Sequence, residues 1–560
     1  MGPSGPARHA DRVLRNARIL TLDARSTIAA SMAIRGERIA AVGSEADMAP
    51  HIGPGTMTTD LGGRTVMPGI VDGHAHMDRE GLKGLLPSLA GVRDIEALVE
   101  RLRQICSGVP AGQWVVTMPL GDPPGYRSSA AMFAEGRLPN RHDLDRAGSS
   151  HPILIRSAWG YWSRQAPLIC IANSRALDLA GVGRGTPSPS AKLQIERDPG
   201  GEPTGVIYES DAMPIAEFTL FRSAPNFTLD DRVRSLADGM RVYNSVGTTS
   251  VFEGHGAAPE VQRAYQRLRA GGRQSARAHL VFSPGWSRLS RQDVKEMLAS
   301  WAQYLAGRGL GDEWLRVAGI FTEIDDSPEA RLRARCAPQT GWAGFCYDCG
   351  LPRQAVKELM LEAARQGIRV CGIAENLFEL YAETHRKVPI AGQRWVLGHQ
   401  TFLDAQRISQ ARDMGLVLTT HTQIYKRGAE FLAQAGREHE NTIYPFRSLL
   451  DAGVPVSLGT DNVPPSVFYS IWEVTERMES KSGKALGPAQ RISREEALRC
   501  ATVNGAFLCF EENDKGSLEP GKLADLAVFD DDPLTVSADR LKDLGAAMTM
   551  AGGRIVYERD

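Results

Sequence analysis

The sequence predicts an α/β fold: a (β/α)8 barrel of the TIM type, a small β-sandwich built from both termini, and an insertion over the barrel mouth. Three observations lead to this prediction. Strand-like segments lie near both ends of the chain, and the middle alternates strands with longer helical segments. Histidine and acidic residues follow several of the middle strands. In a parallel barrel such residues share one face, so the sequence predicts a single polar site there.

Length and composition indicate a soluble globular chain with more than one structural unit. At 560 residues, the chain is too long for a single small core. Hydrophobic residues make up 42% and charged residues 23%, which is ordinary for a globular protein. The 65 basic and 66 acidic residues give a net charge of -1, so neither nucleic acid nor a membrane surface is an expected partner. No apolar run approaches the roughly 20 residues that cross a bilayer, and the first residues lack the apolar stretch of a secretory signal.

The eight cysteines are scattered along the chain rather than paired at short spacings. This usage predicts a reducing compartment, and the cytoplasm is the expected location. Cys346 and Cys349 have the CxxC spacing of a metal or redox motif, but no second pair accompanies them in the sequence. We therefore interpret them as incidental thiols.

Short β segments at the two ends of the chain predict one sandwich domain. Near the amino terminus, strands are expected at residues 12–19, 28–35, 38–42 and 63–66, with Gly36-Glu37 as a tight turn. Near the carboxyl terminus, strands are expected at 524–529 and 547–557, with Gly552-Gly553 as a hairpin turn. The predicted domains are residues 1–66 and 513–560, which together form the sandwich, and residues 67–512, which form the barrel.

The long middle of the chain alternates between the two kinds of element. Helices are expected at residues 98–105, 229–245, 291–306, 354–366 and 404–414. Strands are expected at 114–118, 248–252, 315–321, 368–373, 394–397, 416–419 and 454–458. Strands separated by helices indicate a parallel sheet, and the number of repeats favours a closed barrel over an open sheet.

A His-x-His pair follows a short apolar strand at Ile70-Val71, which a Pro68-Gly69 turn precedes. His74 and His76 are two residues apart, so strand alternation places both imidazoles on the same side. Two converging imidazoles form half of a transition-metal site. The alternative is two unrelated loop histidines, which the preceding strand and the long α/β segment after the pair disfavour.

Other metal-binding or acid–base residues also stand at the ends of predicted strands. They are Glu253, His399, His421 and Asp461. Barrels of this type place their active sites at the carboxyl ends of the strands. We therefore predict that these residues converge with the histidine pair.

Residues from about 120 to 225 are rich in Pro, Gly and Ser, and they include the aromatic cluster Trp159, Tyr161 and Trp162. We interpret this segment as an insertion over the barrel mouth, and we expect the three aromatic side chains to contact the substrate. The alternative is that they pack the core of the insertion itself.

Residues 66–76 resemble the first-strand signature of the metal-dependent amidohydrolase superfamily. Further segments resemble its amidohydrolase 3 branch, which includes N-substituted formamide deformylase. These segments are residues 173–177, 201–206, 247–250, 459–461, 495–498 and 516–526. The matches extend from about residue 12 to residue 557, which is nearly the whole chain.

The resemblance implies a barrel that binds a divalent metal, with zinc expected, and that hydrolyses an amide-like C–N bond. In that chemistry the metal lowers the pKa of bound water to about 7 and polarises the substrate carbonyl, while a carboxylate acts as general base. Carried over by position, the metal ligands are His74, His76, His399 and Asp461. Asp461 is also the expected general base, and His399 is the second expected catalytic residue.

Three positions depart from the family pattern. The relatives have a bridging lysine where this chain has Phe321, and a histidine where it has Ile373. Neither side chain can bind metal, so we expect one ion rather than two. The third departure is Tyr161, which stands where the relatives have histidine and would offer a hydroxyl group to the substrate.

Four residues are candidate substitute ligands or acid–base groups. Glu323 and Glu375 each lie two residues beyond a lost ligand, so strand alternation would point them the same way. Glu253, in the segment Glu253-Gly254-His255, lies at another strand end, and His421 stands where the relatives have glutamine. The alternatives are solvated loop carboxylates and a hydrogen-bonded core histidine.

The leading prediction is an enzyme: a mononuclear metal hydrolase that acts on a small amide, carbamate or cyclic amide-like substrate of aromatic or apolar character. A second hypothesis is C–C bond hydrolysis, decarboxylation or another lyase-type reaction that uses the altered ligands. A third is a catalytically degenerate barrel that only binds a ligand. The expected partner is a small molecule, and a homodimer is expected because dimers are common among the relatives.

Overall fold

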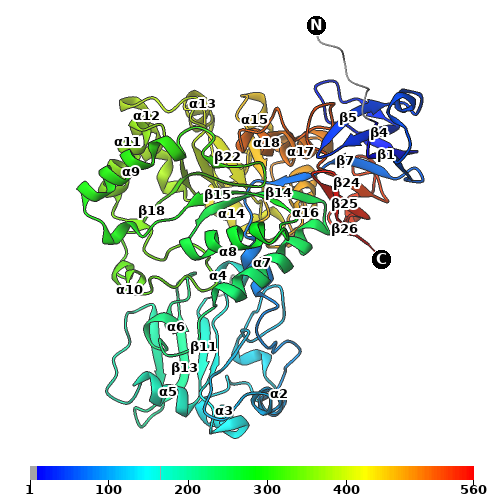
Figure 1. The fold of residues 1–560 in the computed structure, drawn as a ribbon. Helices are drawn as coiled ribbons and strands as arrows, with labels where there is room; N and C mark the ends of the chain where they lie inside the picture. Colours follow the sequence, from blue (N-terminus) through cyan, green and yellow to red (C-terminus); the bar gives the residue numbers. More distant parts are fainter. Residues whose placement is uncertain (1–8, 164–165, 560) are drawn as a thin grey trace.

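The computed structural model describes residues 9–163 and 166–559, and it has three parts (Figure 1). A barrel forms the body of the molecule, and strands from the two ends of the chain, drawn in blue and red, lie together on one side of it. An inserted lobe, drawn mainly in cyan, projects from the barrel at the bottom of the view. The predicted fold class, a TIM-type barrel with a split β-sandwich and an insertion, is confirmed.

The barrel is a sheet of eight parallel strands. In spatial order they are β23 (Val456–Leu458), β22 (Val417–Thr420), β21 (Val396–Gly398), β20 (Val370–Gly372), β17 (Leu315–Phe321), β15 (Arg277–Phe282), β14 (Thr248–Ala257) and β8 (Ile70–Asp72). The short β16 (Leu310–Gly311) adds to β17 in antiparallel orientation. The Gly73 amide donates to the Leu458 carbonyl at 2.8 Å, which joins the first strand to the last. All eight carboxyl ends therefore meet at one mouth.

Helices connect the barrel strands. They include α7 (Leu229–Asn244), α8 (Pro259–Ala270), α9 (Arg291–Leu305), α11 (Arg353–Arg365), α12 (Phe378–Lys387), α13 (Ala405–Asp413), α14 (Ile424–Ala435) and α16 (Val467–Glu476). Thr228 and Ser290 begin α7 and α9 with capping boxes, which satisfy the free amides of the first turn. The predicted helices at 229–245, 291–306, 354–366 and 404–414 are confirmed. Among the described residues, no helix combines the length and the apolar character that crossing a membrane requires.

One strand expected in the barrel repeats belongs elsewhere. Residues 114–118 contain β9 (Val115–Thr117), which pairs with β10 (Ile153–Ile155) in the inserted lobe and not with a barrel strand. The helix expected at 98–105 is α2 (Ile95–Ser107), and it packs against the same inserted strands. The barrel strand missing from the prediction is β15.

Two polar residues make β15 hard to predict from the sequence pattern. Arg277 and His279 interrupt an otherwise apolar run, yet they are only 0% and 1% exposed. Arg277 pairs with Asp525 at 2.7 Å, and His279 Nε2 lies 3.3 Å from Glu511 Oε1. Both partners come from the C-terminal part of the chain. Because only the folded chain supplies them, local pattern cannot identify these side chains as buried.

The inserted lobe has a sheet and a core of its own. Its strands run in the order β12 (Leu193–Arg197), β13 (Pro203–Glu209), β11 (Leu168–Ala172), β10 and β9. The helices α2, α3 (Arg141–Gly148) and α5 (Ser174–Ala180) pack against one another and this sheet. The segment is therefore more regular than its Pro, Gly and Ser content suggested.

Two sheets form the sandwich. One has the order β5 (Arg38–Gly43), β4 (Ser31–Arg35), β1 (Arg12–Arg15) and β6 (Met57–Asp60). The other has the order β26 (Arg554–Glu558), β25 (Met548–Ala551), β24 (Leu526–Phe529), β7 (Thr65–Pro68), β2 (Arg18–Leu20) and β3 (Ile28–Ala29). β24 pairs with β7, so the two ends of the chain share one sheet. Gly552 and Gly553 have φ values of 55° and 70°, as the predicted hairpin turn requires.

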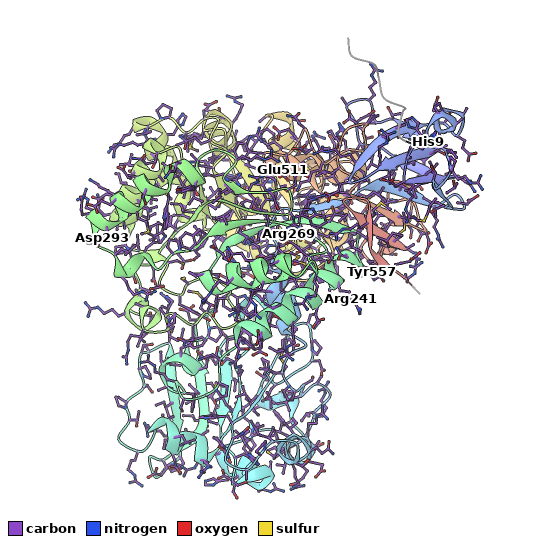
Figure 2. All side chains as sticks on the ribbon, in the orientation of Figure 1. His9, Arg241, Arg269, Asp293, Glu511 and Tyr557 are labelled. Carbon is purple, nitrogen blue, oxygen red and sulfur yellow. The ribbon has the colours of Figure 1, made fainter. Side chains whose placement is uncertain are left out.

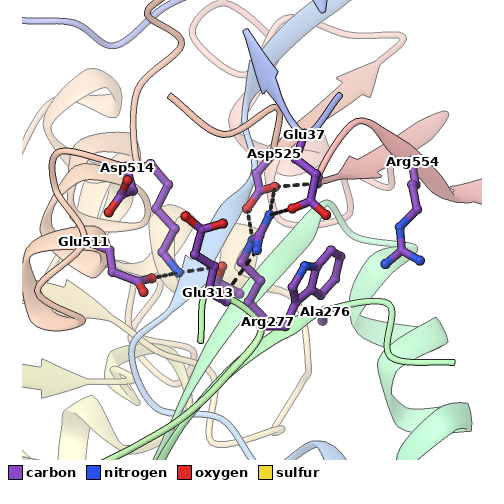
Figure 3. Close-up of polar contacts among 12 residues, drawn as sticks. Glu37, Ala276, Arg277, Glu313, Glu511, Asp514, Asp525 and Arg554 are labelled. Atoms are coloured by element: carbon purple, nitrogen blue, oxygen red, sulfur yellow. Dashed lines mark hydrogen bonds and ion pairs between the residues drawn. The ribbon is translucent and has the colours of Figure 1, made fainter. Parts of the chain in front are cut away.

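A buried ion pair fastens the sandwich to the barrel (Figure 3). The Arg277 guanidinium donates to both carboxylate oxygens of Asp525, at 2.7 and 3.1 Å. It also lies over the Trp314 ring, and Glu37 lies 3.8 Å away. Because β15 carries Arg277 and the sandwich carries Asp525, this contact fixes the two parts relative to each other.

A second polar cluster lies at the end of the barrel opposite the strand carboxyl ends. Its centre is Glu511, a buried carboxylate in the interior of the molecule (Figure 2). Glu511 pairs with Lys515 at 2.8 Å and with Arg308 at 2.9 Å. His279 on β15 also contacts Glu511, so the cluster ties the C-terminal part of the chain to the barrel.

The variant Asp525→Asn tests the anchoring role of the ion pair. It removes the charge partner of a buried guanidinium, so we expect the free energy of unfolding to fall by about 3–5 kcal/mol. Denaturant unfolding measures the loss. The matched variant Asp530→Asn breaks the surface pair with Arg559 and should change stability little. Equal losses in both variants would contradict the role given to Asp525.

Candidate metal centre

The carboxyl ends of β8 and β23 bring a histidine and an aspartate together. The Asp461 amide donates to the His74 carbonyl at 2.8 Å. Gly459 permits this approach, because a Cβ at that position would lie 2.6 Å from the His74 Cβ. Asp72 accepts hydrogen bonds from the His74 amide and from the Thr460 amide and hydroxyl. These bonds fix the two strand ends relative to each other.

Four buried side chains form a cluster at this point. They are His74, His76, His255 and Asp461, whose ligand atoms all lie within 4.8 Å of one another. His76 Nε2 lies 3.2 Å from Asp461 Oδ1, and His74 Nε2 lies 3.9 Å from the same oxygen. The His255 ring stacks on the His76 ring, with the centroids 4.7 Å apart.

A second group, His399, His421 and Asp461, adjoins the first through its shared aspartate. His421 Nε2 lies 3.8 Å from Asp461 Oδ2, and the Nε2 atoms of His399 and His74 are 3.2 Å apart. Two imidazole nitrogens on one tetrahedral ion lie roughly 3.3 Å apart, given bonds of about 2.0–2.1 Å. The structure therefore brings the predicted strand-end histidines and Asp461 to one place.

Backbone conformations at the site are unusual. His399, Asp461 and Asn462 have φ values of 54°, 49° and 47°, although none is glycine. Such conformations cost on the order of 1–3 kcal/mol each and persist where the surroundings impose them. Here they direct His399 and Asp461 into the shared cluster.

Burial keeps two of the imidazoles neutral. Burial, with the nearby His399 and His255, lowers the pKa of His74 well below its ordinary value. Burial and His76 lower the pKa of His255 in the same way. Among the described residues, neither ring nitrogen of His255 has a hydrogen-bond partner, so a lone pair is available. Neutral imidazoles with one carboxylate fit a divalent transition metal.

Asp461 carries the negative charge of the cluster. Burial opposes that charge, but His76, His421 and His399 around the carboxylate hold the pKa of Asp461 well below its ordinary value. Asp461 is therefore an ionised carboxylate at neutral pH, with one oxygen facing each group of histidines.

A buried arginine, not predicted from the sequence, stands beside the cluster. Arg79 lies on α1 (Met77–Leu82), three residues after His76, and is 0% exposed. Its Nε and Nη2 donate to the carbonyls of Trp342 and Ala343, at 3.0 and 2.9 Å. Its Nη1 lies 3.7 Å from Asp461 Oδ1. The helical spacing after the His-x-His pair was the signal that could have identified it.

Glu253 lies behind His76 and not in the cluster. Its Oε1 accepts from the Tyr265 hydroxyl at 2.6 Å and from the Met77 amide at 3.1 Å. Its Oε2 lies 3.4 Å from His76 Nδ1, the ring nitrogen remote from Asp461. A carboxylate in this position fixes the orientation of the ring and strengthens it as a metal ligand.

The variant Glu253→Gln tests this supporting role. Glutamine removes the charge behind His76, so we expect metal affinity to fall by about 10- to 100-fold. Competition with a chromophoric chelator measures the affinity. Glu375→Gln is the matched control, because Glu375 accepts from the Thr401 amide outside the described metal-binding groups. Unchanged affinity in Glu253→Gln would contradict the role.

His255 was not proposed from the sequence, although the segment Glu253-Gly254-His255 was noted. On a regular strand Glu253 and His255 would point the same way. β14 is irregular here, because the four steps from Glu253 to Ala257 match only two steps on β15. Gly256 has a φ of 77° within this bulge. The irregularity sends His255 into the cluster and leaves Glu253 behind it.

The structure does not bring Glu323 or Glu375 into either described group. Glu323 Oε1 lies 3.7 Å from Cys349 Sγ, and burial raises the pKa of Glu323 to about 7. Phe321, at the position of the absent lysine, contributes an apolar wall, with its ring 6.0 Å from that of His255.

The three predicted substrate-binding aromatics occupy different places. The Arg79 guanidinium lies 4.7 Å from the centre of the Trp159 ring, and Trp159 contacts Tyr161 with ring centroids 5.6 Å apart. Tyr161 is 40% exposed, whereas Trp159 and Trp162 are buried. Trp162 packs on Trp342 at 5.2 Å. Trp159 therefore stands beside Arg79 and the cluster, Tyr161 packs on Trp159, and Trp162 packs between the lobe and the barrel.

Comparison with known proteins gives the family of the chain. Residues 57–557 match the model of the Amidohydrolase family. The chain is 28% identical to the N-substituted formamide deformylase of Arthrobacter pascens over 98% of both chains. It is 22% identical to the putative amidohydrolase YtcJ of Bacillus subtilis, over 90% of this chain and 91% of that one. A solved metal-dependent hydrolase from Pyrococcus furiosus, uncharacterized, shares the fold with a TM-score of 0.68 at 20% identity, covering 94% of this chain and 100% of its own. The chain belongs to the amidohydrolase family, as its motifs predicted.

Proposed function

We propose that this enzyme hydrolyses a C–N bond in a small amide, carbamate or cyclic amide-like substrate, with the help of a divalent metal. The observation that carries the proposal is the buried cluster of His74, His76, His255 and Asp461 at the strand ends. The similarity to a formamide deformylase over nearly the whole chain supports an amide-like bond.

One zinc ion is the proposed cofactor. The His74-x-His76 pair and Asp461 would hold it, and His255 or His399 would complete a four-coordinate site. When bound, such an ion activates water and polarises a carbonyl group. One ion is proposed rather than two, because Phe321 and Ile373 stand at the positions where a lysine and a histidine would hold a second ion, and neither side chain can bind metal.

Asp461 is the proposed general base. Its carboxylate is ionised, and Oδ2, the oxygen that faces His421, is placed to accept a proton from the attacking water. A weakly basic carboxylate suffices, because a bound metal ion would lower the pKa of that water. Asp461 would then deliver the proton to the leaving nitrogen. His399, whose ring lies 4.7 Å from that of His421, borders the same space as the second proposed catalytic residue.

The substrate is proposed to be aromatic or apolar. Phe345 and Phe321 lie 5.3 and 6.0 Å from the His255 ring, and Trp159 lies on the other side of Arg79. Trp159 also contacts Phe345, with ring centroids 6.1 Å apart, so these rings offer joined apolar contact area next to a polar reaction centre, as small-molecule sites commonly do.

Product analysis tests the proposed reaction. Metal-loaded enzyme is incubated with an aromatic N-substituted formamide, an aromatic carbamate and a cyclic amide, and the products are identified by mass spectrometry. We expect new amino groups from at least one substrate, with one water consumed per bond. Release of carbon dioxide or an aldehyde without any amine would contradict hydrolysis and favour a lyase reaction.

A further inference from the structure

We propose that Arg79 and Trp159 form a carboxylate-binding subsite beside the metal centre, so that the substrate carries a carboxylate near the bond that is cleaved. The statement about the bond rests on the proposed function, whereas the binding of a carboxylate can be tested without turnover.

The first observation is that the buried guanidinium of Arg79 has no carboxylate within hydrogen-bond distance among the described residues. Arg79 is 0% exposed, and the two carbonyls of Trp342 and Ala343 hold its Nε and Nη2 in place. Asp461 is the one carboxylate that the described residues bring within 4.0 Å of it. At 3.7 Å, that contact is longer than a hydrogen bond. A buried charge is costly unless an opposite charge is paired with it.

Asp461 cannot serve as that pair while it serves the metal centre. Oδ1 of Asp461 already faces His76 at 3.2 Å, and Oδ2 faces His421 at 3.8 Å. A cation bound among these histidines would take up the charge of Asp461. Arg79 would then lose the one ion-pair partner that the described residues give it, and an anionic ligand would take that place.

The second observation is an unpaired donor on the same wall. Trp159 is 0% exposed, and its Nε1 has no hydrogen-bond acceptor among the described residues. An indole nitrogen only donates, so an acceptor must come from elsewhere. The Arg79 guanidinium lies over the Trp159 ring, 4.7 Å from its centre, so the two residues are in contact.

A carboxylate matches this pair of donors. One of its oxygens would accept from Arg79 Nη1 and the other from Trp159 Nε1, and its single negative charge equals the charge of one guanidinium. Tyr161, which is 40% exposed, packs on Trp159, so a residue in contact with this pair reaches solvent. The inferred substrate class is therefore an aromatic or apolar amide that also carries a carboxylate.

Calorimetric titration with benzoate and with its neutral isostere benzamide tests the subsite in the metal-loaded, full-length enzyme. We expect the wild type to bind benzoate at least about tenfold more tightly than benzamide. Arg79→Gln should abolish this preference, with a loss of benzoate affinity of roughly 10- to 100-fold. Arg79→Lys should retain part of it. Trp159→Phe, which keeps the ring and removes the donor, should weaken benzoate by a smaller factor.

Arg288→Gln is the matched control, because this arginine is 56% exposed at its side chain and pairs with Asp348 away from the cluster. It should leave both affinities unchanged, and elemental analysis should show equal metal content in all variants. A benzoate preference that survives in Arg79→Gln would mean that the anion binds the metal alone, and would overturn the proposal. Equal binding of benzoate and benzamide by the wild type would also overturn it. Neither result touches the hydrolysis test, because no turnover is measured.

Discussion

Asp461→Asn is expected to lower kcat/KM by about 100- to 10,000-fold on any substrate that the enzyme hydrolyses. Asparagine has nearly the same shape, but it cannot take a proton from water. It also replaces the charged partner that lies 3.2 Å from His76 Nε2. Steady-state kinetics on preparations of equal metal content measures the effect and separates lost proton transfer from lost metal.

The control for this variant is Glu323→Gln. Glu323 is also a carboxylate near the barrel mouth, and burial raises its pKa to about 7, which would suit a general base. Its Oε1 lies 3.7 Å from Cys349 Sγ, and Glu323 lies outside both described ligand groups. We expect Glu323→Gln to keep most of the activity. If it is the more damaging variant, Glu323 is the base and the assignment to Asp461 is wrong.

His255→Ala is expected to lower zinc affinity by more than the roughly 10- to 100-fold expected for Glu253→Gln. The reason is that His255 lies among the candidate ligands, whereas Glu253 acts through His76. Because a metal that binds only the folded state stabilises it, zinc should also raise the unfolding temperature less in this variant. Chelator competition and thermal unfolding with and without zinc measure the two effects.

The exposed residue His142 provides the control for His255→Ala. Its side chain is 70% exposed on the inserted lobe, so His142→Ala removes an imidazole without touching the cluster. It should leave zinc affinity unchanged. Wild-type affinity in His255→Ala, together with a large loss in His399→Ala, would show that His399 and not His255 completes the site.

Local signals in the sequence were enough for most of the fold. The His-x-His pair follows an apolar strand, and capping residues such as Thr228 and Ser290 mark where long helices begin. β15 could not be predicted because Arg277 and His279 give its sequence an exposed character. Their charge partners are far along the chain: Asp525 lies 248 positions after Arg277, and His279 pairs with Glu511. Long-range charge pairing is invisible to a local pattern.

In the site, too, local sequence patterns could identify some residues and not others. His74, His76, His399 and Asp461 could be found because each follows the end of a strand. His255 could not, because a bulge in β14 breaks the alternation on which the prediction depended. Arg79 could not be found in this way either, because it lies on a helix and not at the end of a strand.

A crystal structure of the full-length chain grown with zinc, with anomalous data at the zinc edge, tests the central claim most directly. We expect one anomalous peak, bonded at about 2.0–2.2 Å to His74, His76 and Asp461, with His255 or His399 as the fourth protein ligand. Two ions joined by Asp461, or no ion among these residues, would contradict it.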